Sequence, residues 1–361
     1  MEVYGAKGIQ EVIDHFNAGK PLERTRLDAQ REFHENLDYP DFDFSDVKGQ
    51  ESIKRCMEIA ASGGHNIILI GPPGSGKTML AKRLPSILPP MTLQEALETT
   101  KIHSVVGKVR NRGLMCHRPF RNPHHTISSA ALVGGGSYPQ PGEISLSHNG
   151  VLFLDELQEF ERRVLEVMRQ PMEDREVTIA RAKFTVTYPS SFMLVASMNP
   201  SPGGYFNDPD APVTSSPVEM QRYLGKISGP LLDRIDIHIE VAPVPFEKLS
   251  ENQKAESSKE IRQRVVKARE VQTERFAQMD KVHYNAQMTT KQIRKYCNLE
   301  QQTKKLLKNA MERLNLSARA YDRILKVART IADLEGSTEI LGSHVSEAIQ
   351  YRSLDREGWL G

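Results

Sequence analysis

The sequence lacks both the paired cysteines typical of proteins in oxidising compartments and the long apolar runs typical of membrane proteins. Its 361 residues include three cysteines, Cys56, Cys116 and Cys297, and no CxxC pair, which excludes a disulfide framework and favours a cytoplasmic location. The longest apolar runs, "IILI" and "VLFL", are far shorter than a membrane span, and no signal-peptide pattern opens the chain. We therefore expect a cytoplasmic protein with no membrane partner.

One long segment lacks acidic residues altogether. Between Lys101 and Gly142 there are six Lys or Arg and no Asp or Glu, although the net charge of the whole chain is +2. The same segment holds four of the eleven histidines. The uneven distribution of charge, and not its total, therefore indicates a polyanionic partner.

The order of apolar runs and helical patterns predicts an α/β fold. Strand-like runs alternate with helical periods up to residue 243, which is typical of a parallel sheet flanked by helices. We expect strands at 67–70, 102–106, 151–154, 193–197 and 237–241. We expect later helices at 259–279, 289–296, 300–314, 318–334 and 343–351. The predicted organisation is a linker with one short helix at 1–46, an α/β core at 47–243, a polar connection at 244–258 and a small all-helical domain at 259–361.

A complete phosphate-binding motif lies in "NIILIGPPGSGKTML". A strand is followed by G-x-x-x-x-G-K-[ST] and the start of a helix, so backbone N–H groups and the positive end of the helix can surround phosphate oxygens. We expect Lys77 to neutralise the β- and γ-phosphates of ATP, and the hydroxyl of Thr78 to bind Mg²⁺. The residues predicted to contact the nucleotide are Gly71, Pro72, Pro73, Gly74, Ser75, Gly76, Lys77, Thr78 and Met79.

Carboxylates suited to hydrolysis follow a second buried strand. In "GVLFLDELQEF", four apolar residues run into Asp155 and Glu156, at the end of the strand where α/β sheets bind ligands. We expect Asp155 to hold Mg²⁺ with Thr78, and Glu156 to orient or deprotonate the attacking water. The strand in "FMLVASMNP" ends in Asn199, whose amide could hold the same water. The alternative for paired acids, the first turn of a helix, fits the preceding apolar strand less well.

Arg234 in "GPLLDRIDIHIEV" has three interpretations. It is an ion-pair partner of Asp233 or Asp236, a structural arginine, or a group that reaches the γ-phosphate of a neighbouring subunit. The last role can raise the rate of phosphoryl transfer by about 10³-fold or more, whereas a surface ion pair contributes under about 1 kcal/mol. The residues by themselves leave the choice open.

Together these motifs resemble those of AAA+ ATPases. Segments such as "RPFRNPHHTISSAALVGGG", "PGEISLSHNGVLFLDELQEF" and "LSARAYDRILKVARTIADLEG" are similar to the magnesium-chelatase-related ComM/YifB family, from about residue 47 to the end. The resemblance implies a P-loop AAA+ core, a helical lid domain and a homo-oligomeric ring, expected to be a hexamer, with ATP between subunits. Residues 1–25 resemble the end of that family's Lon-like N-terminal domain, so we expect the chain to be a fragment.

The resemblance also implies roles for single residues. By position, Arg234 matches the arginine that acts in trans, and Arg319 in "LSARAYDRI" matches the second sensor arginine, with Arg323 as the alternative one turn on. A basic helix face would explain Arg319 and Arg323 without any such role, since Lys326 and Arg329 lie nearby.

The sequence departs from many members of that family after Asn199, which matches their sensor asparagine, because those members carry two Cys-x-Cys pairs there. Here Ser201, Gly203, Val213 and Ser215 occupy the matching positions. No thiolate remains, so we predict no structural zinc.

The segment "CHRPFRNPHHTISSAALVGGG" is open to several interpretations. As a metal site it offers the adjacent pairs Cys116-His117 and His124-His125, and adjacent side chains rarely both reach one ion. As a second phosphate loop it lacks a Lys-Ser/Thr after its glycines. As a basic insertion it would meet nucleic-acid phosphates, together with a hairpin predicted around residues 177–187, unless both are solvated loops or subunit contacts. The predicted DNA contacts are Arg110, Arg112, Arg118, Arg121, Arg181 and Lys183.

The function that these features predict is an ATP-driven ring motor, with ATP and Mg²⁺ as cofactors. The resemblance implies action on single-stranded or branched DNA, as a helicase or branch-migration enzyme in transformation or recombination. The alternatives are the motor subunit of a metal chelatase, which would need a partner subunit, and a protein-remodelling ATPase similar to MoxR. The GAFTGA loop of related transcription activators is absent.

Overall fold

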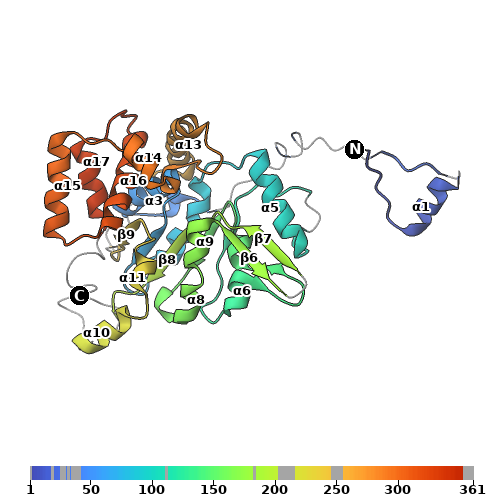
Figure 1. The fold of residues 1–361 in the computed structure, drawn as a ribbon, viewed down its shortest axis with the longest axis horizontal. Coiled ribbons are helices and arrows are strands. Elements are labelled where there is room, and N and C mark those ends of the chain that lie inside the picture. Colours follow the sequence, from blue (N-terminus) through green and yellow to red (C-terminus); the bar gives the residue numbers. More distant parts are fainter. Residues whose placement is uncertain are drawn as a thin grey trace.

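The computed structural model describes residues 2–17, 20–24, 30, 33, 42–109, 113–181, 184–201, 216–244 and 255–352. A five-stranded sheet lies at the centre of the α/β core, between two layers of helices (Figure 1). All neighbouring strands run parallel, in the order β2-β5-β8-β1-β9. Their bounds are Phe120–Arg121 for β2, Val151–Leu154 for β5, Met193–Met198 for β8, Ile67–Ile70 for β1 and Ile237–Glu240 for β9.

Strands β1 and β5 are apolar and buried along their whole length because both faces of the sheet are covered. In β1, Ile67 and Leu69 face one hydrophobic core, whereas Ile68 and Ile70 face a second core on the other side. The first core is completed by α3 (Glu51–Gly63), α4 (Lys77–Arg83) and η2 (Leu84–Ile87). The second is completed by α6 (Ser129–Val133), α7 (Glu143–Leu146), η3 (Leu157–Glu159), α8 (Arg162–Glu166), α10 (Pro217–Leu224) and α11 (Gly229–Leu232).

The strand predicted at 102–106 is wrong. These residues lie at the end of α5, Leu93–Val105, which begins with a capping box formed by Thr92 and Glu95. Buried Ala96, Thr99, Ile102 and His103 recur at helical spacing, so the β-branched run is the last turn of an amphipathic helix. The edge of the sheet is formed instead by β2, in which Phe120 pairs with Val151.

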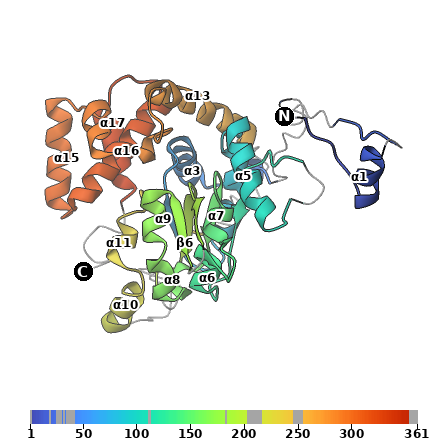
Figure 2. The same ribbon diagram turned by 45° about the vertical axis from the view of Figure 1, so that its right-hand side comes forward.

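The helices predicted after the core are confirmed, with boundaries that differ by at most three residues and are identical for 318–334. They are α13 (Ser258–Phe276), α14 (Thr290–Tyr296), α15 (Gln301–Arg313), α16 (Ala318–Leu334) and α17 (Gly342–Gln350), with a short η4 at Asn285–Gln287. Figure 2 shows α13 above α3, and both α13 and α16 pack on α3. The same hydrophobic cluster therefore continues from the sheet into this helical region.

Two small antiparallel sheets accompany the central sheet. The predicted hairpin is confirmed as β6 (Glu176–Ala180) and β7 (Thr185–Pro189), which follow α9 (Arg169–Asp174). The other pairs β3 (Gly134–Gly135) with β4 (Gln140–Pro141), inside the acid-free stretch 101–142, which we call the basic segment. The helix expected near the N-terminus is α1, Ile9–Phe16, and none of its residues is buried.

Candidate nucleotide-binding site

The loop between β1 and α4 has a backbone that only glycine accommodates at three positions. Gly74 and Gly76 have φ angles of 79° and 90°, in the left-handed region that side chains other than glycine rarely adopt. A Cβ atom on Gly71 would lie 2.3 Å from the carbonyl oxygen of Val241, just beyond β9. The loop is therefore held against a neighbouring strand at one end and turns sharply at the other.

Lys77 lies at the start of α4 with its ammonium group folded into this loop. Its Nζ donates hydrogen bonds to the carbonyls of Gly71 (2.6 Å) and Pro72 (2.9 Å) and to Oδ1 of Asn199 (3.3 Å). Burial lowers the pKa of Lys77, and the nearby carboxylates of Asp155 and Glu156 oppose that shift. The charge of this lysine is thus directed at the centre of the loop, where phosphate would lie.

The residues after β5 form a connected polar cluster with β8 and α4. Oγ1 of Thr78 donates to Oδ2 of Asp155 at 2.8 Å. Ser197 donates its hydroxyl to Oδ1 of Asp155 and accepts the backbone N–H of Glu156 at 3.1 Å. This arrangement follows from the register, because Leu154 pairs with Ala196 and the next residues along both strands, Asp155 and Ser197, are neighbours. Glu156 itself has a φ of 53°, a strained conformation that turns the chain at the end of the strand.

These donors fit a nucleotide with Mg²⁺. A carboxylate and a hydroxyl are the hard oxygen ligands that Mg²⁺ prefers, and this ion commonly uses one or two protein groups with water for the rest. The hydroxyl of Ser75, in the loop, is buried and makes no hydrogen bond within the described part of the chain. A buried, unpaired hydroxyl at this position matches a group placed to meet a phosphate oxygen.

Asn199 lies beside the loop, as expected from its place after β8. Its side chain contacts Lys77, and its carbonyl accepts the hydroxyl of Tyr223 from α10 at 2.9 Å. Burial, with Glu159 and Glu156 nearby, raises the pKa of Tyr223, which keeps this phenol a hydrogen-bond donor. Gln50 supports the loop from the other side by donating to the carbonyl of Ser75 at 3.2 Å.

Three residues of the site were missed from the sequence. Ser197 is the one hydroxyl residue in the run "MLVASM", and that interruption of an apolar strand was a usable signal. Gln50 and Tyr223 come from segments distant in the chain, and nothing in their local patterns indicates the contact.

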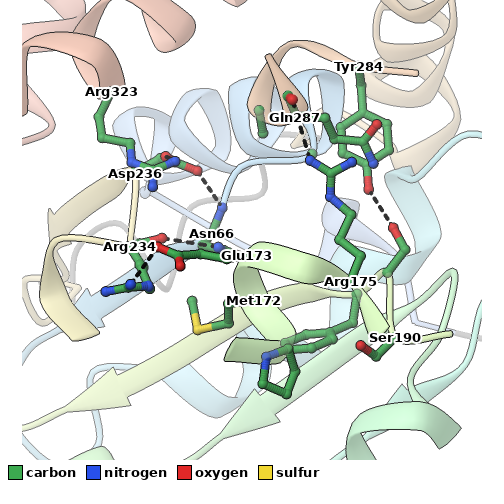
Figure 3. Close-up of a pocket in the computed structure, with 15 residues that line it drawn as sticks. Asn66, Met172, Glu173, Arg175, Ser190, Arg234, Asp236, Tyr284, Gln287 and Arg323 are labelled. Carbon is green, nitrogen blue, oxygen red and sulfur yellow. Dashed lines mark hydrogen bonds and ion pairs between the residues drawn. The ribbon is translucent and has the colours of Figure 1, made fainter. Parts of the chain in front are cut away.

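Arg234 lies outside the loop, in a polar pocket between the core and the helical region (Figure 3). Its guanidinium forms an ion pair with Glu173 of α9 and donates to the carbonyl of Pro230 at 2.5 Å. Asn66 donates to the carbonyl of Arg234 at 3.1 Å, which anchors the backbone at this point. The ion pairs with Asp233 or Asp236 that the sequence suggested for Arg234 are replaced by the one with Glu173.

Arg319 and Arg323 lie near Arg234. Arg319, 64% exposed, donates to Asp233 at 2.9 Å, and Arg323 pairs with buried Asp236 at 3.0 Å. Burial alone would raise the pKa of Asp236, but Arg323 and His65 outweigh it and hold that pKa well below its usual range. Arg234, Arg319 and Arg323 line one hollow of about 280 Å³, and none of the residues 71–79 lines it. The structure thus brings both predicted arginines together and keeps them apart from the phosphate loop of the same chain.

Two of the predicted DNA contacts, Arg118 and Arg121, form hydrogen bonds and ion pairs within the chain. Arg118 donates to both carboxylate oxygens of Glu95 and to the carbonyls of Pro89, Pro90 and Asn149. Arg121 forms a two-point ion pair with Glu143 of α7. These guanidinium groups hold the basic segment to the core, so we do not retain them as DNA contacts.

Of the remaining predicted DNA contacts, Arg181 lies exposed at the tip of the β6–β7 hairpin. Arg110, Arg112 and Lys183 lie outside the described residues.

Cys116, His124 and His125 of the basic segment make contacts within the chain. Cys116 is buried, and the rings of His124 and His125 lie with centroids 4.1 Å apart at an interplanar angle of 33°, with Phe160 next to His125. Among the residues that the structure describes, no three His, Cys, Asp or Glu side chains gather as a metal-binding group. The positions that replace the Cys-x-Cys pairs lie mostly outside the described residues, so the zinc prediction stays a prediction. Among the described helices, none combines the length and apolar character needed to cross a bilayer.

Comparison with known proteins yields two adjoining family matches. Residues 43–249 match the family described as "Magnesium chelatase, subunit ChlI", and residues 255–352 match "Magnesium chelatase, subunit ChlI C-terminal".

Individual relatives agree with these matches. "Competence protein ComM" of Haemophilus influenzae is 48% identical over 87% of this chain and 60% of its own length. "Uncharacterized protein YifB" of Escherichia coli is 48% identical over 87% of this chain and 61% of its own length. "Magnesium-chelatase 38 kDa subunit" of Cereibacter sphaeroides is 24% identical over 45% of this chain and 54% of its own length. The chain thus spans 60% or 61% of the length of the first two relatives.

Proposed function

Because this chain belongs to the family of the magnesium chelatase subunit ChlI, we propose that it is a Mg²⁺-dependent ATPase that works as a ring on DNA. The observation that carries the ATPase proposal is the cluster of Lys77, Thr78, Asp155, Glu156 and Asn199. These residues follow three adjacent parallel strands at the same edge of the sheet. Carboxyl ends of parallel strands are where such sheets bind ligands.

Each residue has a defined task in this proposal. Lys77 binds the phosphates of ATP, and Thr78 with Asp155 holds Mg²⁺, which supplies charge neutralisation when bound. Glu156 orients and deprotonates the attacking water, and Asn199 fixes that water from the neighbouring strand. Ser197 keeps the two carboxylates in register by bonding to Asp155 and to the backbone of Glu156.

The test of the catalytic assignment is the ATPase rate of Glu156→Gln. We expect nucleotide binding close to that of the wild type and turnover lowered about 10²-fold or more, because a general base contributes on that scale. Glu159→Gln is the matched control, since Glu159 lies one turn on and forms an exposed pair with Lys226. Normal turnover in Glu156→Gln would remove the assignment.

The ring is supported by the separation of the arginines from the loop. Arg234 and Arg319 line a hollow to which residues 71–79 do not contribute, so their phosphate partner would come from a neighbouring copy. An arginine supplied in this way stabilises the charge of the phosphoryl transition state.

Mixing two inactive variants tests this arrangement. Neither Glu156→Gln nor Arg234→Ala is expected to hydrolyse ATP alone. In an equal mixture, about a quarter of the interfaces would carry an intact Glu156 and an intact Arg234, so about a quarter of the wild-type rate should return. No recovery in mixed oligomers would show that Arg234 acts within its own subunit.

Action on DNA is supported by the exposed Arg181 and by the higher identity to the ComM and YifB proteins than to the chelatase subunit. We expect single-stranded and forked DNA to raise the ATPase rate and to bind with an affinity that falls as salt rises. If neither occurs, and unfolded protein or a chelatase partner stimulates turnover instead, the DNA part of the proposal is wrong while the ATPase part remains.

A further inference from the structure

Two hairpins from separate parts of the chain pack against each other. The first is β3–β4, and the second is β6–β7. Tyr188 of β7 donates its hydroxyl to the carbonyl of Pro139 at 2.9 Å, and Nε of Arg181 donates to the carbonyl of Gly136 at 3.2 Å. A Cβ atom on Gly134 would lie 2.6 Å from Ile179, so the start of the first hairpin is also in close contact with the end of β6.

The tips of these hairpins carry an exposed pair of aromatic rings. Tyr138 is 76% exposed and Phe184 is 48% exposed, and their ring centroids lie 6.3 Å apart with an interplanar angle of 34°. They are the two most exposed of the described Phe, Tyr and Trp side chains between residues 47 and 243. Large apolar rings left in water are unfavourable, so a pair of them at the turns of two packed hairpins indicates a contact surface.

The chemistry around the pair favours an anionic occupant. No Asp or Glu occurs in 101–142 or in 180–189, whereas Arg181 and Lys183 are in the second of these segments. Arg181 is exposed, and the bonds of its guanidinium that the structure describes go to backbone carbonyls, which leave its positive charge uncompensated. Single-stranded nucleic acid combines flat bases that stack on aromatic rings with phosphates that meet such cations.

We propose that Tyr138 and Phe184 form a platform on which the unpaired bases of single-stranded DNA stack, with Arg181 next to the backbone phosphate. This inference rests on the proposed action on DNA and names the residues that perform the contact. Stacking is tolerant of sequence, since every base has a flat face, so the platform would serve a protein that moves along a strand.

The test is binding of a fluorescein-labelled oligothymidylate, measured by anisotropy over a series of salt concentrations, with Mg²⁺ and a slowly hydrolysed ATP analogue present. Tyr138→Ala and Phe184→Ala should each weaken binding about 10-fold without changing the slope of log affinity against log salt, because a ring carries no charge. Arg181→Ala should lower that slope by about one.

Control variants separate stacking from a general effect. Phe42→Ala removes a ring that is also 48% exposed but lies outside the hairpins, and it should bind as the wild type does. Tyr138→Phe and Phe184→Tyr keep a ring and should restore the affinity, which excludes misfolding as the cause of the loss.

The outcomes distinguish this inference from the proposed function. If the wild type binds and the two alanine variants bind equally well, the platform is wrong and the action on DNA stands. If the wild type does not bind the oligonucleotide, both the platform and the proposed action on DNA are wrong. If an unfolded polypeptide of neutral charge displaces the DNA and itself requires Tyr138 and Phe184, the platform serves polypeptide and the inference is overturned.

Discussion

Ser197 shows how much of the site depends on one hydroxyl group. It is fully buried, it donates to the carboxylate that would hold Mg²⁺, and it accepts the N–H of the residue proposed as base. It touches neither phosphate nor water in our proposal, so it is a positioning residue. Groups of this kind set the orientation of the residues that bind the metal.

We expect Ser197→Ala to lower the ATPase turnover by about 10- to 100-fold, the range found when support of a metal ligand is removed. Binding of a fluorescent nucleotide without Mg²⁺ should change little, because Lys77 and the loop are untouched. Ser145→Ala is the matched control, since Ser145 is also fully buried and makes no hydrogen bond within the described residues. Equal losses in both variants would point to packing and not to positioning.

Glu173 is the second residue whose role is visible only in the folded chain. Its carboxylate pairs with Arg234, so it would compete with a neighbour's phosphate for the same guanidinium. Glu173→Gln should therefore raise turnover by up to about fivefold, which corresponds to the roughly 1 kcal/mol of a partly exposed ion pair. Asp174→Asn, at the adjacent exposed position, is the control, and a fall in the rate of Glu173→Gln would instead make Glu173 a residue that positions Arg234 for the reaction.

At the scale of single elements, the basic segment is organised by its own arginines. Glu95 caps the start of α5 and also accepts two hydrogen bonds from Arg118, just before β2. Burial alone would raise the pKa of Glu95, but Arg118 and the N–H of Thr92 outweigh it and lower that pKa. The positive charge of Arg118, which the sequence suggested was available to DNA, therefore joins α5 to the edge of the sheet.

Arg118→Ala should lower the free energy of unfolding by about 2 kcal/mol, because three carbonyls lose their donor and the partly buried carboxylate of Glu95 keeps only the N–H of Thr92 among its described donors. The measurement is urea unfolding followed by circular dichroism. The salt dependence of DNA binding should stay as in the wild type. Unchanged stability together with a smaller salt slope would restore Arg118 as a phosphate contact.

At the scale of the whole molecule, the core and the helical region share buried charges. Lys326 of α16 is buried beside Arg323 and Asp236, and its Nζ donates to the carbonyl of Ala286 at 2.9 Å. Burial, with a smaller contribution from Arg323, lowers the pKa of Lys326 to about 8. The folded state therefore disfavours the charged form of this lysine.

The sign of the resulting pH dependence follows from the lowered pKa. Below pH 8, Lys326 is charged in both the folded and the unfolded state, so folding carries the full free-energy cost of burying its charge. Above about pH 10.5 the lysine is neutral in both states, and this cost disappears. Stability attributable to Lys326 should thus rise between these values by about 3 kcal/mol. The measurement is the difference in unfolding free energy between the wild type and Lys326→Met across this range. If the difference in unfolding free energy between the two proteins does not vary with pH, the lowered pKa of Lys326 is contradicted.

The sequence by itself determined the class of fold and the phosphate loop. Both depend on local patterns: apolar runs that fit buried strands, helical spacing after residue 258, and a motif whose glycines and lysine lie within eight residues. Asp155, Glu156 and Asn199 could be placed for the same reason, because each directly follows a buried strand. The strand expected at 102–106 failed because β-branched residues at a helix end look like a strand when the capping box before them is overlooked.

Only the tertiary structure decided which charges are free and which are paired. Arg118 and Arg121 form ion pairs with carboxylates distant in the sequence. Glu173 forms an ion pair with Arg234. Arg319 lines the same hollow as Arg234, away from the phosphate loop. The pairing of Tyr138 with Phe184 likewise joins residues 46 positions apart. Such contacts depend on the register of the sheet and the packing of the helical region on α3, and neither leaves a periodic trace in the sequence.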